Sequence, residues 1–274
     1  MTQAQTPIYV INLPQSTARK SAISSQLNDI GVDFEIFRAV DGRTDELPSW
    51  PRYDEEKAIQ TKCWPLNAGQ LGCFYSHVRL WRCCVESGRP LIVIEDDALI
   101  LKDAFQRFLE QCHQIPERFG CVRLFTHRRR QFRLLATEQI AGLALNLYNK
   151  GHITTTGYYL QPSAAEVLLS HADNFFLPVD LYLDRFWQHG VLPYGVQTAC
   201  LSPDPALASD IGARAHSAES QWRKQRTSWL GKIRRERFRF NELFRRKLWW
   251  LQNRDHLKRM QAPEITKNHA VHNT

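Results

Sequence analysis

The chain has 274 residues, of which 43% are hydrophobic and 23% charged, and its formal net charge at pH 7 is +8. This composition is typical of a folded protein with a sizeable core and excludes a disordered chain. No apolar run approaches the roughly 18 residues of a membrane-spanning helix, and Met1 to Gln5 lack the layout of a secretory signal. We therefore expect a globular protein that neither crosses a membrane nor carries a signal peptide.

The positive charge is concentrated near the carboxyl end. Residues 222–260 contain 14 Lys or Arg and three acids, so the preceding part of the chain is slightly acidic. This contrast predicts two parts, a globular domain at 1–221 and a basic, aromatic tail at 222–274. The seven cysteines are scattered and form no C-x-x-C pair, which is typical of reduced thiols in a cytosolic protein.

The first 37 residues predict a strand, a helix and a second strand. Residues 7–12 form a short apolar run, residues 16–30 are helical in pattern and end at Gly31, and residues 33–37 alternate like a strand. Such a βαβ unit predicts a parallel sheet with a ligand crevice at the carboxyl ends of its strands.

The next segment, 43–66, is charged and contains three prolines, so we expect an irregular loop. A long helix follows, with Asn67 as its cap, Gly88 and Pro90 at its end, and apolar residues every three or four positions. His77 lies on this helix, and we interpret it as a core histidine with satisfied hydrogen bonds.

The rest of the body alternates between the two kinds of element, which predicts an α/β fold. We expect strands at 91–94, 121–125, 143–148, 153–160 and 194–199, and helices at 103–112, 163–171 and 180–189.

The most informative residues are Glu95, Asp96 and Asp97, which directly follow the buried strand at 91–94. Adjacent carboxylates repel one another, and a cation or dense hydrogen bonding must offset that repulsion. Side chains alternate along a strand, so Glu95 and Asp97 can share a face. Because Mg²⁺ and Mn²⁺ prefer carboxylates together with phosphates, the pair indicates a metal–diphosphate site. The alternative is that the three acids form a solvated turn that caps the next helix.

A second pair of acids, Asp180 and Asp184, lies four residues apart, which places both on one face of the expected helix. One of them is a candidate general base for a sugar hydroxyl, whereas the alternative for Asp180 is a helix cap.

Two loops carry further candidates. His216, in a loop of small residues, is a candidate metal or phosphate ligand or a plain surface residue. Residues 128–130 form a solvated arginine loop or a site for an anionic acceptor.

The tail at 222–260 has the pattern of a basic amphipathic helix. Its tryptophans and apolar stripe favour the surface of an anionic membrane. Two alternatives are a helix that packs on the body and a nucleic-acid contact, the latter being the least favoured. The clustered acids and the basic tail also fit two further functions, a metal-dependent phosphoryl-transfer enzyme or nuclease and a non-catalytic membrane or nucleic-acid adaptor.

A series of short motifs runs through the chain in a fixed order, at 8–13 with Arg19, 37–42, 66–77 with Trp81, 94–98, 157–160 with 164–165, 178–180 and 209–211. This series resembles glycosyltransferase family 25, the lipooligosaccharide glycosyltransferases, many of which are β-1,4-galactosyltransferases. The resemblance spans roughly residues 7–215 and leaves the basic tail outside. Gln70 stands where the family usually has an acid.

The resemblance implies a GT-A-like, Rossmann-type nucleotide-sugar fold, an inverting transfer and a Mn²⁺ (or Mg²⁺) cofactor. It implies UDP-galactose or UDP-glucose as donor and a lipid-linked oligosaccharide of the lipopolysaccharide core as acceptor. We therefore expect a cytoplasmic enzyme that is peripheral on the cytoplasmic face of the inner membrane, binds anionic lipid through 222–260, and has no specific nucleic-acid partner.

The resemblance also implies roles for individual residues. Asp97 would hold the metal, Glu95 the ribose or a metal-bound water, and Asp180 or Asp184 would be the catalytic base. His216 is a further candidate for the metal shell. The residues expected around the nucleotide are Asn12, Leu13, Arg19, Ala39, Asp41 and Asp96.

Overall fold

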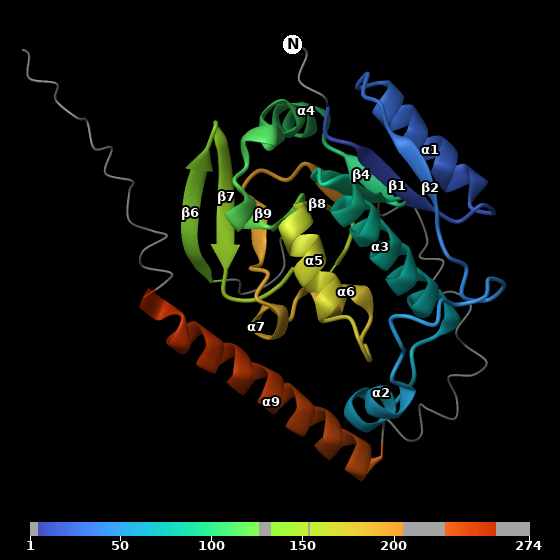
Figure 1. Ribbon diagram of the computed structural model, residues 1–274, viewed down its shortest axis with the longest axis vertical. Coiled ribbons are helices and arrows are strands. Elements are labelled where there is room, and N and C mark those ends of the chain that lie inside the picture. Colours follow the sequence, from blue (N-terminus) through green and yellow to red (C-terminus); the bar gives the residue numbers. More distant parts are fainter. Residues whose placement is uncertain (1–4, 126–132, 153, 205–227, 256–274) are drawn as a thin grey trace, which may run out of the picture.

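The computed structural model describes residues 5–125, 133–152, 154–204 and 228–255. At its centre is an eight-stranded sheet in the order β2-β1-β3-β8-β5-β9-β7-β6, beside a two-stranded sheet of β10 and β4 (Figure 1). The central strands are β1 (Ile8–Asn12), β2 (Glu35–Arg38), β3 (Leu91–Glu95), β5 (Cys121–Arg123), β6 (Leu134–Ile140), β7 (Leu143–Tyr148), β8 (Gly157–Leu160) and β9 (Tyr194–Val196). The small sheet pairs β4 (Ala98–Ile100) with β10 (Leu201–Pro203).

Helices cover both faces of the central sheet, so the expected α/β class is confirmed. They are α1 (Thr17–Asn28), α2 (Glu55–Lys62), α3 (Ala68–Ser87), α4 (Lys102–Gln111), α5 (Pro162–Ser170), α6 (Val179–Leu183), α7 (Phe186–His189) and α9 (Trp229–Gln252). The strongest local signal holds for α3. The Asn67 side chain accepts a hydrogen bond from the Gln70 backbone N–H, and the Gln70 side chain accepts one from the Asn67 backbone N–H. Gly88 ends the helix in the left-handed conformation.

The first strands confirm the predicted βαβ unit. β1 pairs in parallel with β2 on one side and with β3 on the other, so the carboxyl ends of these three strands meet at one edge. The sheet is not parallel throughout, however, because β8 runs antiparallel to both β3 and β5. The apolar pattern of a segment shows that it forms a buried strand, but not whether that strand runs parallel or antiparallel to its neighbours. For this reason the sequence did not predict a mixed sheet.

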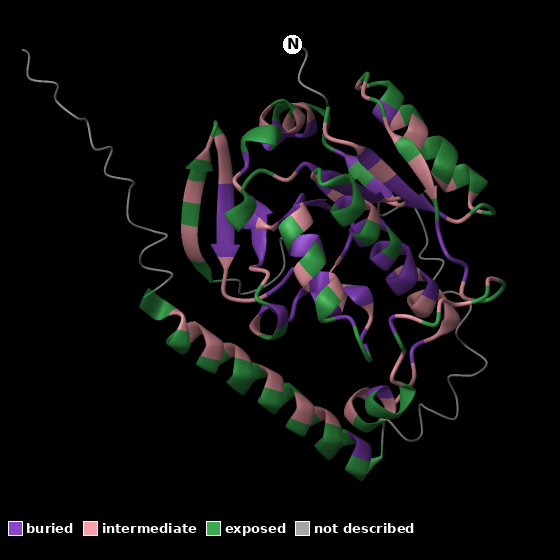
Figure 2. Ribbon diagram, in the orientation of Figure 1, coloured by how far each residue is buried: buried purple, intermediate pink, exposed green. Residues whose placement is uncertain are grey.

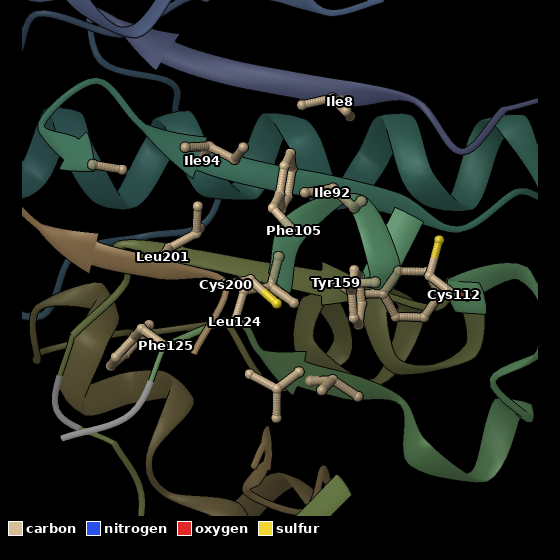
Figure 3. Close-up of a cluster of buried hydrophobic side chains, with 14 of the residues drawn as sticks. Ile8, Ile92, Ile94, Phe105, Cys112, Leu124, Phe125, Tyr159, Cys200 and Leu201 are labelled. Atoms are coloured by element: carbon tan, nitrogen blue, oxygen red, sulfur yellow. The ribbon is translucent and has the colours of Figure 1, made fainter. Parts of the chain in front are cut away.

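Side chains alternate along the central strands between two apolar clusters. Ile92 and Ile94 of β3 lie in one cluster, with Phe105 of α4 and Tyr159 of β8 (Figure 3). Val93 points to the opposite cluster, where α3, α5 and α6 pack. Figure 2 shows the buried strands at the centre of the molecule and exposed residues along β6 and α9. β3 is thus held on both faces, which fixes the position of the acids that follow it.

Two segments differ from the sequence prediction. The expected loop at 43–66 contains α2, whose first turn is capped by the Asp54 side chain accepting from the Lys57 backbone. The expected helix at 180–189 is two short helices, α6 and α7, which are separated at Asp184 and Arg185. Local capping explains α2, whereas the prolines around it had indicated a loop.

The surface strand β6 also lacked a sequence signal, because its residues are only half-buried or exposed.

The basic helix α9 packs on the body. Arg185 donates to Glu242 at 2.8 and 3.0 Å, and the Trp250 indole donates to the Asn149 carbonyl at 3.0 Å. Trp249 and Trp250 also contact the Phe186 ring. Among the described residues, no helix is both long and apolar enough to span a bilayer.

Candidate functional site

A pocket lies at the edge where β1, β2 and β3 end. The loop after β1, the loop after β2, the first turns of α3 and the acids after β3 form its walls. Its lining residues are Ile11, Leu13, Arg19, Ala39, Val40, Asp41, Gly42, Arg43, Gly69, Cys73, Ser76, His77, Glu95, Asp96 and Asp97. The crevice expected at the carboxyl ends of parallel strands is therefore present.

Most of the residues singled out in the sequence come together here. Leu13, Arg19, Ala39, Asp41, Glu95, Asp96 and Asp97 all line the pocket. Asn12 is only 2% exposed and lies behind the lining, where it contacts Asp96. Asp180 and Asp184 are not among the lining residues. His216 and Arg128 to Arg130 lie outside the described residues.

Asp96 is held by two side chains from the first βα segment. Asn12 Nδ2 donates to Asp96 Oδ2 at 2.7 Å, and Arg19 Nη1 donates to Asp96 Oδ1 at 2.9 Å. Burial raises the pKa of Asp96, while these two partners act in the opposite direction. Both carboxylate oxygens therefore serve to fix the turn between β3 and β4.

Asp97 is the more accessible acid of this turn, with 31% of its side chain exposed. Burial, followed by repulsion from Glu95, raises its pKa to about 6. Asp97 forms an ion pair with Arg19, whose Nη1 lies 3.7 Å from Asp97 Oδ2. A carboxylate under such repulsion fits a divalent cation, because a cation would stabilise its charged form.

Glu95 faces the inner wall of the pocket. It accepts a short hydrogen bond from the Thr155 hydroxyl, and its Oε1 lies 3.7 Å from His77 Nε2. Burial opposes its charge, but His77, Thr155 and Arg123 together hold its pKa below the usual value. The pKa of Glu95 is therefore shifted in the opposite direction from those of Asp96 and Asp97.

The loop after β2 is fastened to both neighbouring elements. Asp41 Oδ2 accepts from Gln15 at 2.7 Å, its Oδ1 accepts from the Arg43 backbone, and the Val40 N–H donates to Ser76 of α3. Asp41 thus joins the two loops that border the pocket. Its carboxylate therefore lines the pocket and also holds these two loops in place.

The structure separates the environments of the two later aspartates. Asp184 is 8% exposed, accepts from the His152 N–H at 2.9 Å and lies 3.5 Å from an Arg123 nitrogen. Asp180 is half-buried in the first turn of α6, and burial followed by the Glu95 charge raises its pKa. Asp184 is therefore held in a buried network, whereas the pKa of Asp180 depends in part on the charge of Glu95 in the pocket.

Several lining residues had no sequence signal of their own. Arg43, Cys73 and Ser76 enter the pocket only because their loops and α3 fold against β3. His77 is fully buried, as expected for a core histidine, but among the described residues its Nε2 has no hydrogen-bond partner. The expectation that this histidine is fully satisfied is therefore wrong.

The sequence model of a known family, glycosyltransferase family 25 (LPS biosynthesis protein), matches residues 5–183. The match covers the whole edge of the sheet described above, from β1 to α6.

Known proteins that contain similar sequences include proteins of animals, of bacteria and of a virus. Procollagen galactosyltransferase 2 of Mus musculus is 26% identical over 200 residues, which are 68% of this chain and 31% of the mouse protein. Inactive glycosyltransferase 25 family member 3, also of Mus musculus, is 28% identical over 225 residues, 72% of this chain and 36% of that protein. Lacto-N-neotetraose biosynthesis glycosyltransferase LgtB of Neisseria gonorrhoeae is 26% identical over 191 residues, 64% of this chain and 65% of LgtB. The chain thus spans about a third of the length of these mouse relatives.

Proposed function

The chain belongs to glycosyltransferase family 25, and from that premise we propose that it transfers a hexose from a UDP-sugar, galactose in the first instance, to an oligosaccharide acceptor of the lipopolysaccharide core. UDP-glucose is the alternative donor, since the two sugars differ at one hydroxyl. A GT-A-like arrangement, in which the nucleotide lies at the carboxyl ends of parallel strands, accounts for the position of the pocket.

The observation that carries this proposal is the turn Glu95–Asp96–Asp97 at the edge shared by β1, β2 and β3. Arg19 enters the same pocket and pairs with both aspartates. A nucleoside diphosphate needs cationic groups for its phosphates and a polar wall for its ribose, and this pocket provides both kinds of group. Asn12, Leu13, Ala39 and Asp41 would border the nucleotide.

The donor set also fits a hard divalent cation, Mn²⁺ or Mg²⁺. Asp97 is partly exposed, and its pKa is raised first by burial and then by repulsion from Glu95; a cation would offset that repulsion. Asp97 would be the principal ligand, with Glu95 beside it and His216 as a further candidate. When bound, the cation would neutralise charge on the departing UDP.

Asp180 is the better candidate of the two later acids for the general base. Its pKa is raised by burial, which suits a group that must accept a proton near neutral pH. It would take the proton of the acceptor hydroxyl while that oxygen attacks the anomeric carbon and the bond to UDP breaks on the opposite face, so the configuration inverts. Asp184 would instead support α6 through Arg123 and the His152 backbone.

The acceptor side of the proposal involves α9, which has two different faces. Gly231, Phe238, Glu242 and Trp249 share one face by their spacing, and this face meets the body through Cys63, Phe176, Arg185 and Phe186. The apolar residues of the opposite face are exposed: Trp229 by 73%, Phe240 by 69% and Leu251 by 69%, together with Ile233 and Phe244.

This second face has the properties of an interfacial membrane helix. Arginines flank the exposed apolar stripe, and the two acids of α9 are already paired, Glu242 with Arg185 and Glu236 with Arg239. Anionic lipid headgroups attract such cations by ~1 kcal/mol each. Packing on the body and contact with a membrane are therefore compatible, and we place the enzyme on the cytoplasmic face of the inner membrane, where a lipid-linked acceptor would lie.

The experiment that tests the transferase proposal is a direct transfer assay. The full chain is incubated with Mn²⁺, UDP-galactose or UDP-glucose, and a panel of lipooligosaccharide core acceptors, and the released UDP and the product's anomeric configuration are measured. We expect transfer from one donor with inversion, and a loss of at least two orders of magnitude in Asp180→Asn. Hydrolysis of nucleic acid or nucleotides without sugar transfer would instead indicate a phosphoryl-transfer enzyme.

A further inference from the structure

Three side chains of different chemistry converge on the inner wall of the pocket. Cys73 and His77 are four residues apart on α3, so they share one helix face, and Glu95 reaches them from the end of β3. The ligand atoms of this cluster, the Cys73 sulfur, a His77 ring nitrogen and a Glu95 carboxylate oxygen, all lie within 4.8 Å of one another. We call this set the Cys–His–Glu cluster.

The histidine of the cluster has one nitrogen without a partner. His77 is 0% exposed, and among the described residues Nε2 makes no hydrogen bond, since Glu95 Oε1 is 3.7 Å away. A buried polar atom left unpaired costs roughly 1–3 kcal/mol. A cation bound within this cluster would give the unpaired nitrogen a partner.

The groups behind the histidine hold it in the orientation that a metal ligand needs. His77 Nδ1 lies 2.8 Å from the Tyr158 hydroxyl, which also accepts from the Trp81 indole at 2.9 Å. When a cation binds Nε2, the ring proton would stand on Nδ1, from which His77 would donate to Tyr158. Metal-binding histidines commonly donate their second ring nitrogen in this way. Thr155 similarly holds the carboxylate of Glu95.

We propose that the Cys–His–Glu cluster is a divalent-cation site of the zinc type. Thiolate, imidazole and carboxylate are the ligands that Zn²⁺ takes, whereas Mg²⁺ and Mn²⁺ favour oxygen ligands alone. Ligand distances of ~2.0–2.3 Å require the three atoms to approach by about 1 Å. On binding, the thiol proton leaves to solvent, and the two anionic ligands balance the charge of the cation. A fourth position would remain open toward the pocket.

The site shares Glu95 with the metal–diphosphate site at Asp97 and differs from it in its other two ligands, Cys73 and His77. The proposal does not depend on sugar transfer. The two proposals also predict different residue dependence, since only the Cys–His–Glu cluster uses a sulfur ligand.

The test uses Co²⁺ as a spectroscopic probe for Zn²⁺ in the full chain after removal of metal with a chelator. We expect one equivalent of Co²⁺ to bind with the intense near-ultraviolet absorption of a cobalt–thiolate bond, and Zn²⁺ to displace it. Cys73→Ser should remove this absorption. Cys83→Ser is the matched control, because Cys83 is another partly exposed thiol of α3 outside the cluster.

Two further variants complete the design. His77→Ala should weaken Co²⁺ binding at least tenfold, with circular dichroism reporting whether it is folded. Asp97→Asn should keep the cobalt–thiolate absorption while losing the response to UDP-sugar, which distinguishes failure of this site from failure of the proposed transferase. Absence of the absorption in the folded wild-type chain, or its persistence in Cys73→Ser, would overturn the proposal.

Discussion

Asn12 and Asp96 are joined by a 2.7 Å hydrogen bond between the ends of two adjacent parallel strands, although they are 84 residues apart in the sequence. Because Asn12 and Arg19 occupy both oxygens of Asp96, that acid fixes the turn. The neighbours of Asp96 are then free for ligand chemistry. In a run of three acids, the structure thus assigns a supporting position to the middle one.

Replacing Asn12 with alanine should lower both stability and ligand binding. The substitution leaves a buried carboxylate oxygen without its donor, and we expect a loss of about 1–3 kcal/mol in the free energy of unfolding. Urea denaturation measures this loss. Asn28→Ala, at an exposed position on α1, is the control and should change stability by less than ~0.5 kcal/mol. Equal effects of the two substitutions would contradict the role given to Asn12.

Gly72 should tolerate no side chain. A Cβ at this position would lie 2.2 Å from the Val40 carbonyl oxygen and 2.7 Å from the Gly42 nitrogen, both of which are backbone atoms. Gly72→Ala would push α3 away from the pocket wall, so we expect lower stability and weaker UDP-sugar binding. Gly88→Ala at the other end of α3 has open space but a positive φ of 60°, so it should lower stability alone. Calorimetry with and without the nucleotide separates the two effects.

The buried His189 should make the protein less stable in acid. Its neutral ring uses both nitrogens, one toward the Tyr182 carbonyl and one accepting from the Val191 N–H, and burial lowers its pKa to about 3. Since the unfolded pKa is ~6.5, the unfolded chain binds the extra proton first. The stability contributed by neutral His189 is therefore complete above pH 6.5. Between pH 6.5 and 3 the free energy of unfolding falls by up to ~1.4 kcal/mol per pH unit.

The measurement is the free energy of unfolding at a series of pH values, for the wild type and for His189→Gln. We expect the glutamine variant to be less stable at pH 7 but to show a shallower decline between pH 6.5 and 4. Parallel curves for the two proteins would show that His189 is not the source of the acid sensitivity.

The exposed face of α9 should bind anionic vesicles. Exchanging Phe240 and Phe244 for serine removes apolar area from that face, whereas the face on the body is untouched. We expect the double variant to cosediment with phosphatidylglycerol vesicles at least tenfold less than the wild type. The matched control exchanges Leu99 and Leu134, two exposed leucines on β4 and β6, for serine. Equal binding by all three proteins would rule out the membrane face.

Substitutions are preferable here to removal of the whole tail. α9 covers Phe186 and pairs Glu242 with Arg185, so a chain ending before residue 222 would expose buried groups of the body. A loss of vesicle binding in that truncated protein would combine the effect of the missing exposed face of α9 with the effect of a disturbed body.

Local signals predicted those parts of the fold that depend on short stretches of sequence. The cap at Asn67 and the apolar spacing from Leu71 to Val85 are complete within α3 itself, and that helix was predicted closely. α2 was missed because the nearby prolines outweighed the cap at Asp54. The direction of β8 depends on a long-range return of the chain, which has no local signal.

The same distinction applies to the site. The acids at 95–97 were predictable, because they stand at the carboxyl end of a buried strand that pairs in parallel with β1. Asn12, the last residue of β1, was expected here only through the family resemblance. The approach of Cys73 and His77 to Glu95 was not predictable, because it depends on how α3 packs against β3. Nor could spacing alone separate Asp180 from Asp184, since the helix expected to carry both is divided into α6 and α7.

The central claim is that this pocket binds a UDP-sugar with a divalent cation at Asp97, and ligand-dependent thermal unfolding tests it most directly. The wild type and Asp97→Asn are heated with UDP-galactose or UDP-glucose, in Mn²⁺ or in EDTA. At 100 times its dissociation constant, a donor that binds only the folded chain adds ~2.7 kcal/mol, so the wild type should melt several degrees higher with one donor in Mn²⁺. EDTA and Asp97→Asn should each abolish this rise. No rise with any UDP-sugar, or an equal rise in Asp97→Asn, would contradict the claim.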